Sequence, residues 1–250
     1  MISSDTGRHW QVNKELAAKY TSPLDRRLYC DEPVVSLLGD LSNKSVLDLG
    51  CGNGGFTVKL IGAKSIVGID ASLEMLKQAK ALEARFPNLS FIKADAAKLP
   101  FPDRSFEIVV ASMLINTISS KQTVEEVFKE AARVLTKRGR FVISMANPLT
   151  LEKSTKHRRT QWKQGQTQES LVPGEEIIRV FEGKDGATLT VPNYYWPQDV
   201  LIELAKRNNL VHAETLEPKA TEEDLRLHPE LDPELITTLF FLIMEFDKSN

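Results

Sequence analysis

The chain has 250 residues, and its 32 basic and 34 acidic side chains leave a net charge of -2. The composition, with 42% hydrophobic and 26% charged residues, is ordinary for a soluble globular protein, and the near-neutral charge gives no sign of a nucleic-acid or membrane-surface partner. The N-terminus lacks the apolar stretch of a signal peptide, and the longest apolar run, 239–244, is too short to cross a bilayer. A soluble, cytoplasmic protein is expected, and its oligomeric state is not indicated.

Five short apolar runs predict buried parallel strands at 45–50, 65–70, 89–95, 106–112 and 140–146. Helical patterns separate most of them, at 54–62, 72–85 and 121–135, and Ser72 is placed to cap the second. Such alternation predicts right-handed crossovers and an α/β fold with a doubly wound, Rossmann-like sheet.

The segments around this core are expected to cover it. Residues 1–40 favour helices, with Asp31 and Pro33 marking the start of a helix through Leu38. Residues 147–196 break the alternation and predict an inserted lid, with two strands in 177–191 around a Gly-Lys-Asp-Gly turn. A helix from Pro197 to about Arg207 and strands at 210–216 and 237–246 follow. One domain is predicted, with a cover (1–40), a core (41–146), a lid (147–196) and the rest of the core sheet (197–250).

The stretch VLDLGCGNGG, residues 46–55, contains the G-x-G-x-x-G spacing of a dinucleotide site, starting at Gly50. Asp48 precedes it and would repel a pyrophosphate bound over the loop. The same carboxylate would attract a ligand with an ammonium and a sulfonium group, such as S-adenosylmethionine (SAM). Charge therefore favours SAM over a dinucleotide.

Two further acids end the next predicted strands. Asp70 ends the second strand, where either ligand class would use a carboxylate to bind ribose hydroxyls, and Asp95 ends the third, where it could meet an adenine amino group. Three acids at successive strand ends beside a glycine loop favour a ligand site over isolated helix caps. Cys30 and Cys51 lack clustered histidines, which predicts ordinary buried thiols and no metal site.

The sequence resembles class I SAM-dependent methyltransferases over residues 44–148. The matching phrases are VLDLGCGNGGFT (46–57), VGIDASLEML (67–76), FIKADAAKLPFPDRSFEIVVASMLINTIS (91–119) and ARVLTKRGRFVISMANP (132–148). The resemblance implies a seven-stranded sheet with its last strand antiparallel, SAM as methyl donor, S-adenosylhomocysteine (SAH) as product, and no metal. By position it implies that SAM is bound by Asp48, Gly50, Cys51, Gly52, Asp70, Ala71, Leu76, Asp95, Ala96, Ser112 and Met113.

The C-terminal third resembles a branch of bacterial small-molecule methyltransferases, through YYWP (194–197), EP (217–218) and TEEDLRLHPEL (221–231). Tyr195 and Trp196 replace the His and Arg usual there, so no base is implied at that position. Aromatic residues in the cover and lid predict an apolar or planar small-molecule acceptor, with contacts from Tyr20, Tyr29, Tyr194, Tyr195 and Trp196. The candidates for a general base are Tyr194, Tyr195 and His157.

Three other functions stay open. The basic run from Lys153 to Lys163, with Trp162 within it, would suit an RNA methyltransferase, although a solvated lid segment accounts for it better. A catalytically silent SAM-binding module would share the glycine loop and its acids. A dehydrogenase would share the glycine spacing and Asp70.

Overall fold

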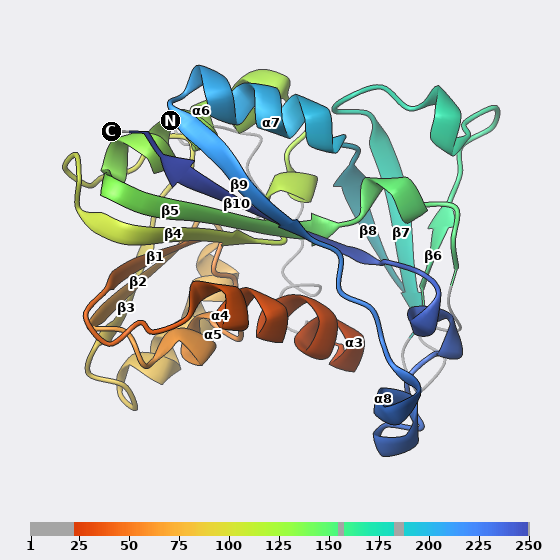
Figure 1. Ribbon diagram of the computed structural model, residues 1–250, viewed down its shortest axis with the longest axis horizontal. Helices are drawn as coiled ribbons and strands as arrows, with labels where there is room; N and C mark the ends of the chain where they lie inside the picture. The colour runs from red at the N-terminus through yellow and green to blue at the C-terminus, as the bar shows by residue number, and fades with distance from the viewer. Residues whose placement is uncertain (1–22, 155–157, 183–187, 250) are drawn as a thin grey trace.

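The computed structural model describes residues 23–154, 158–182 and 188–249, and its main feature is a seven-stranded sheet between two layers of helices (Figure 1). The strand order is β3-β2-β1-β4-β5-β10-β9. The first five strands are parallel, and β10 is antiparallel to both β5 and β9, which confirms the predicted sheet. The strands are β1 (Ser45–Leu49), β2 (Ser65–Asp70), β3 (Leu89–Lys93), β4 (Phe106–Ser112), β5 (Leu135–Ala146), β9 (Leu210–Leu216) and β10 (Phe241–Lys248).

Helices cover both faces because the central strands bury both sets of alternating side chains. In β4, Ile108 and Val110 belong to the core that contains α4 (Glu32–Leu38) and α5 (Leu73–Glu83), whereas Val109 and Ala111 belong to the opposite core. That second core contains α6 (Lys121–Val134) and α7 (Gln198–Arg207). Ser72 caps α5 as predicted, accepting a hydrogen bond of 3.3 Å from the backbone of Met75.

The helix predicted to start at Asp31 and Pro33 in fact begins earlier. A continuous helical run comprises α3 (Leu24–Arg26), a π-helical turn (Arg27–Asp31) and α4. Pro33 has no N–H to donate to the preceding turn, and the wider π turn ends two residues before this proline, at Asp31. The first 22 residues of the predicted cover lie outside the described part of the chain.

The helix predicted over 54–62 is wrong, because only a short 3-10 helix, η2 (Thr57–Leu60), forms there. Gly54 has a left-handed φ of +80°, and a Cβ on it would lie 2.8 Å from the ring of Phe91. Glycine at both ends of this segment disfavours an α-helix. The last strand also starts later than predicted, at Phe241, because a 3-10 helix (Pro233–Ile236) precedes it.

A second, three-stranded antiparallel sheet, here called the lid sheet, contains β6 (Arg158–Gln161), β7 (Glu176–Glu182) and β8 (Thr188–Tyr194). It stands beyond the end of β5 in Figure 1, near the short helix α8 (Glu222–Leu227). Strands β7 and β8 confirm the pair predicted in 177–191, whereas β6 was not predicted. The lid sheet therefore lies at the carboxyl ends of the parallel strands, where parallel α/β folds bind ligands.

Candidate functional site

The glycine loop after β1 has a backbone that only glycine adopts easily. Gly50 and Gly52 have φ values of +69° and +56°, and the N–H of Cys51 donates to the carbonyl of Ile69 over 2.9 Å. A Cβ on Gly50 would lie 2.9 Å from Cδ1 of Leu114, and one on Gly52 would lie 3.5 Å from Cε of Met75. Leu114 and Met75 thus flank the loop, although neither was predicted as a site residue.

The Gly50→Ala substitution is expected to destabilise the protein by about 1–3 kcal/mol, because the new Cβ meets Leu114 and the residue must keep a left-handed φ. Thermal unfolding should show a melting temperature lower by about 2–4 °C for each kcal/mol. Gly62→Ala is the matched control, since nothing lies within 4 Å of the added Cβ there and no left-handed φ is needed. Equal melting temperatures for the two variants would contradict the strain at Gly50.

Asp48 is a buried carboxylate in β1, with only 1% of its surface exposed. Its Oδ2 accepts a hydrogen bond of 2.6 Å from the hydroxyl of Thr57, and among the described residues no other group donates to it. Burial raises the pKa of Asp48 to about 7, which the Thr57 hydrogen bond and Arg26 oppose and Asp70 reinforces. The site therefore holds an acid whose ionised form is short of partners and would be stabilised by a bound cation.

Asp70 joins the glycine loop to the start of α5. Its Oδ2 accepts from the N–H of Gly52 over 2.9 Å, and its Oδ1 accepts from the N–H of Ser72 over 2.7 Å. Burial raises its pKa, against these backbone hydrogen bonds. The N–H of Ala71 also acts on this carboxylate, whose two oxygens still have an acceptor position left for a ligand hydroxyl.

Other predicted SAM contacts also lie at or just after the carboxyl ends of strands, and their side chains make different contacts. Asp95, after β3, accepts from the N–H of Ala97 over 2.9 Å, and Ser112, at the end of β4, accepts a hydrogen bond of 3.0 Å from the Ser144 hydroxyl. Met113 has a φ of +59° and donates its N–H to the carbonyl of Ser144. Leu76 and Ala96 are buried, whereas Ala71 is half-buried. Their contacts with SAM stay predictions.

Both cysteines are free and buried, as predicted. Burial raises the pKa of Cys30 to about 11, and burial with the nearby Asp70 and Asp48 raises that of Cys51 well above its usual range. Thiols of this kind stay protonated and are poor nucleophiles. Across the described residues, no group of three or more His, Cys, Asp or Glu side chains is placed to hold a metal, and no helix is long and apolar enough to span a membrane.

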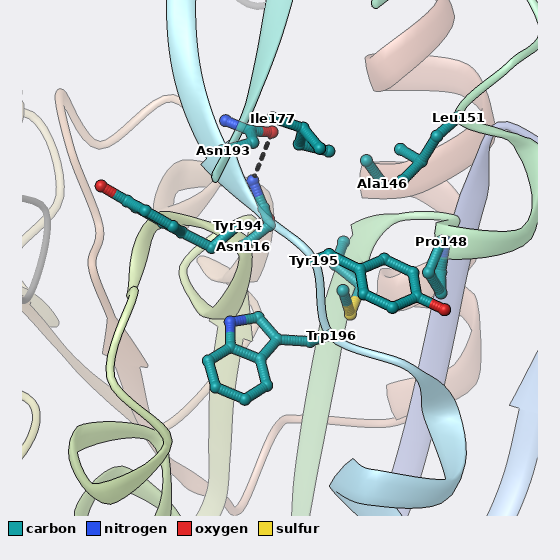
Figure 2. A pocket seen from close by; sticks show the side chains of 10 residues that line it. Asn116, Ala146, Pro148, Leu151, Ile177, Asn193, Tyr194, Tyr195 and Trp196 are labelled. Atoms are coloured by element: carbon teal, nitrogen blue, oxygen red, sulfur yellow. Dashed lines mark hydrogen bonds between the residues drawn. The ribbon is translucent and has the colours of Figure 1, made fainter. Parts of the chain in front are cut away.

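A small cavity lies between the lid sheet, the end of β5 and Asn116, which belongs to the 3-10 helix Ile115–Thr117 after β4 (Figure 2). Its volume of about 10 Å³ has room for roughly one water molecule. Asn116 Nδ2 donates to Asn193 Oδ1 over 3.0 Å across it, and Asn193 Nδ2 donates to the carbonyl of Pro192, which fixes both amide orientations. Asn116 Oδ1 is then buried without a hydrogen-bond partner in the described part of the chain. The cavity is lined by Asn116, Met145, Ala146, Pro148, Leu151, Ile177, Asn193, Tyr194, Tyr195 and Trp196.

Three predicted acceptor contacts reach this cavity. The side chains of Tyr194 and Tyr195 point in opposite directions in Figure 2, and the indole N–H of fully buried Trp196 donates to the carbonyl of Ile118 over 2.8 Å. Burial and Asp199 raise the pKa of Tyr195. Tyr29 lies in a different cluster, where burial and Asp224 raise its pKa to about 12. The predictions for Tyr20 and His157 lie outside the described residues.

The described part of the basic run in the lid is largely solvent-exposed, as the sequence predicted, with Lys153, Arg159 and Lys163 exposed and Arg158 as the exception. Arg158 is buried and paired with Asp25, and Lys163 pairs with Glu176 over 3.0 Å. Trp162 packs against a small apolar cluster. These residues therefore do not present a continuous basic surface to a nucleic-acid backbone.

Comparison with known proteins adds a family and a fold. A family model described as a methyltransferase domain matches residues 40–198. The eEF1A lysine and N-terminal methyltransferase of Homo sapiens is 35% identical over 124 residues, which cover 46% of this chain and 18% of that protein. The demethylmenaquinone methyltransferase of Thermotoga maritima is 36% identical over 114 residues, which cover 44% of this chain and 47% of that protein. The matches thus span less than half of either relative.

A solved structure of an S-adenosylmethionine-dependent methyltransferase from Mesorhizobium loti superposes with a TM-score of 0.63 at 21% identity. The superposition covers 86% of this chain and 96% of that one. At this identity the likeness concerns the fold alone.

Proposed function

Because the chain belongs to the class I SAM-dependent methyltransferase family, we propose that it transfers a methyl group from SAM to a small-molecule acceptor held under the lid sheet. The observation that carries this proposal is the pairing of a buried, partner-poor Asp48 at the glycine loop with a small, mainly apolar cavity between the lid sheet and the end of β5, which the Asn116 and Asn193 amides line. The first suits a cationic donor, and the second suits a small acceptor.

The residues of the glycine loop fit SAM. Bound SAM would supply a methyl group on a positively charged sulfur. Asp48 would contribute a negative charge, Gly50 and Gly52 would let the backbone approach closely, and Asp70 would accept hydrogen bonds from ribose hydroxyls. Met75, beside Gly52, would add an apolar contact.

On the acceptor side, positioning accounts for most of the expected catalysis. Holding two reacting groups in line is worth roughly 7–11 kcal/mol, so a strong base is not required. The raised pKa of Tyr195 keeps its phenol protonated at neutral pH, which argues against the base role and for hydrogen-bond donation. Asn116 Oδ1, buried and unpartnered, is placed to accept an N–H or O–H of the acceptor.

The lid must move for an acceptor to enter, because the cavity has room for only about one water molecule. The small volume of the cavity favours a small molecule over RNA, and burial of Arg158 removes one charge from the exposed basic run. The relative named for lysine and N-terminal methylation makes a protein acceptor the second candidate, which the small volume also disfavours.

The test is incubation with methyl-labelled SAM and a metabolite extract, followed by separation of labelled products. Label in a small molecule is expected with the wild type and not with Asp70→Ala, which should lose the donor. Label confined to protein or RNA in a whole-cell extract would replace the small-molecule proposal. SAM binding without any labelled product would favour the silent binding module.

A further inference from the structure

Two arginines share the inner face of the lid sheet, which faces the core. Arg158 lies opposite Phe181, and Thr160 lies opposite Arg179, so all four side chains project from one face of β6 and β7. Arg158 and Arg179 are only 8% and 3% exposed. Guanidinium groups are rarely buried to this degree unless an anion accompanies them.

The described residues supply only part of that negative charge. Arg158 pairs with Asp25 and stacks over the rings of Phe181, Phe240 and Phe241, with Cζ 5.0–5.6 Å from the ring centres. Its Nε is buried without a hydrogen-bond partner among the described residues. Within that part of the chain one carboxylate pairs with Arg158, none pairs with Arg179, and one donor of Arg158 stays unused.

Arg179 has no ion pair within the described part of the chain. Its Nη1 donates to the hydroxyl of Thr160 and, over 3.4 Å, to the carbonyl of Leu151, and its other nitrogens make no hydrogen bond to described residues. Burial and the nearby Arg158 lower its pKa to about 9. This is the direction expected for a cation that lacks a counter-ion.

The pair lies beside the proposed acceptor cavity. Leu151, whose carbonyl accepts from Arg179, lines the cavity, and so does Ile177, which precedes Arg179 by two residues on the same strand face. On the other side, Phe241, under Arg158, is the register partner of the cavity residue Ala146. An acceptor in an opened cavity would meet these guanidinium groups on the lid side.

We propose that the inner face of the lid sheet binds an anionic oxygen group of the acceptor, a carboxylate or a phosphate, with Arg179 as its main ligand and Arg158 beside it. The inference rests on the proposed function and specifies its substrate class. A planar guanidinium with free donors matches either group in a bidentate arrangement. The anion would complete the charge balance that Asp25 leaves unfinished.

The first test is thermal unfolding at constant ionic strength with sodium phosphate, sodium benzoate or neutral benzamide. The wild type is expected to gain about 3 °C or more from at least one anion near saturation and nothing from benzamide. The anion that protects distinguishes a phosphate site from a carboxylate site. Absence of protection by both anions would overturn the proposal.

The matched variants are Arg179→Met and Arg159→Met, which remove an inward and an outward arginine of the same sheet. Arg179→Met should abolish the anion effect while keeping or raising its own melting temperature, since it removes a buried charge without an ion pair. Arg159→Met should respond like the wild type. Protection of Arg179→Met equal to that of the wild type would contradict the assignment.

A second measurement covers the case in which Arg179→Met fails to fold. Labelled product formed by the wild type from a metabolite extract should be retained on an anion-exchange resin, and a neutral or cationic product would overturn the proposal. Calorimetric measurement of SAM binding to the wild type distinguishes a failure of the proposed function from a failure of the anionic-acceptor proposal. Absence of SAM binding would refute the proposed function, whereas SAM binding without an anion effect would refute only the anionic acceptor.

Discussion

Asp48→Asn is expected to weaken SAM binding by about 10- to 100-fold, the range for loss of a charge-assisted contact. Asparagine keeps an oxygen for the Thr57 hydroxyl, so the loop should keep its local contacts while losing the negative charge. SAH carries one positive charge fewer than SAM and should lose much less affinity. Calorimetric titration of both compounds checks this, with Asp40→Asn, an exposed acid near β1, as control. Equal losses for SAM and SAH would show that Asp48 does not sense the sulfonium charge.

The same carboxylate predicts how SAM affinity depends on pH. With a pKa of about 7, Asp48 is largely protonated below pH 6 in the free protein, and the protonated form does not attract a cation. SAM affinity should therefore fall by about tenfold or more from pH 7.5 to 5.5. Three charged groups, Arg26, Asp70 and Asp31, act on Asp48 in addition to the hydrogen bond from the neutral Thr57 hydroxyl. The Asn variant should lose most of this pH dependence.

Stability should change in the opposite direction to affinity. Asp48 ionises near pH 4 in the unfolded chain, about its usual value, and near pH 7 in the folded chain. Between these values the folded state binds more protons, so the contribution of Asp48 to stability declines as pH rises from about 4 to 7 and is absent at pH 8. Asp48→Asn should thus raise the melting temperature of the free protein at pH 8 by several degrees and change it less at pH 4. Calorimetric scans at both pH values test the sign.

The central sheet could be predicted because its physical signal is local. Strands β1, β2 and β4 are covered by helices on both faces, so each appears as a nearly continuous apolar run, such as SVLDL or FEIVVAS. Asp48 and Asp70 were predicted as site residues by the same reasoning, since each acid ends or nearly ends such a run. The prediction of a helix over 54–62 was wrong because the apolar residues there follow a helical pattern, whereas Gly54 has a left-handed backbone.

The lid could not be predicted to the same degree because its signal is non-local. Strand β6 is RRTQ, and Arg158 is buried only because Asp25 and three aromatic rings meet it from distant segments. The Asn116–Asn193 hydrogen bond joins residues 77 positions apart, and neither neighbourhood indicates the other. Charged or amide side chains are ordinarily exposed, so burial of these residues becomes visible only in three dimensions.

Asp70→Ala is expected to weaken SAM and SAH binding alike, by about 100-fold or more, because two effects add. The substitution removes the acceptor proposed for the ribose hydroxyls, which both compounds carry. It also removes the partner of the Gly52 and Ser72 N–H groups, so the glycine loop loses its tie to α5. A parallel loss for both ligands would contrast with the charge-selective loss expected for Asp48→Asn.

The matched control is Asp40→Ala, because Asp40 also accepts a backbone N–H two residues ahead, at 2.9 Å from Ser42, but is exposed and outside the site. It should leave both affinities unchanged. Calorimetric titration of SAM and SAH against the two variants distinguishes a ligand role from a general effect of losing such a turn. If Asp70→Ala binds SAM as the wild type does, Asp70 is not part of the donor site, and the carboxylate serves only to fix the loop.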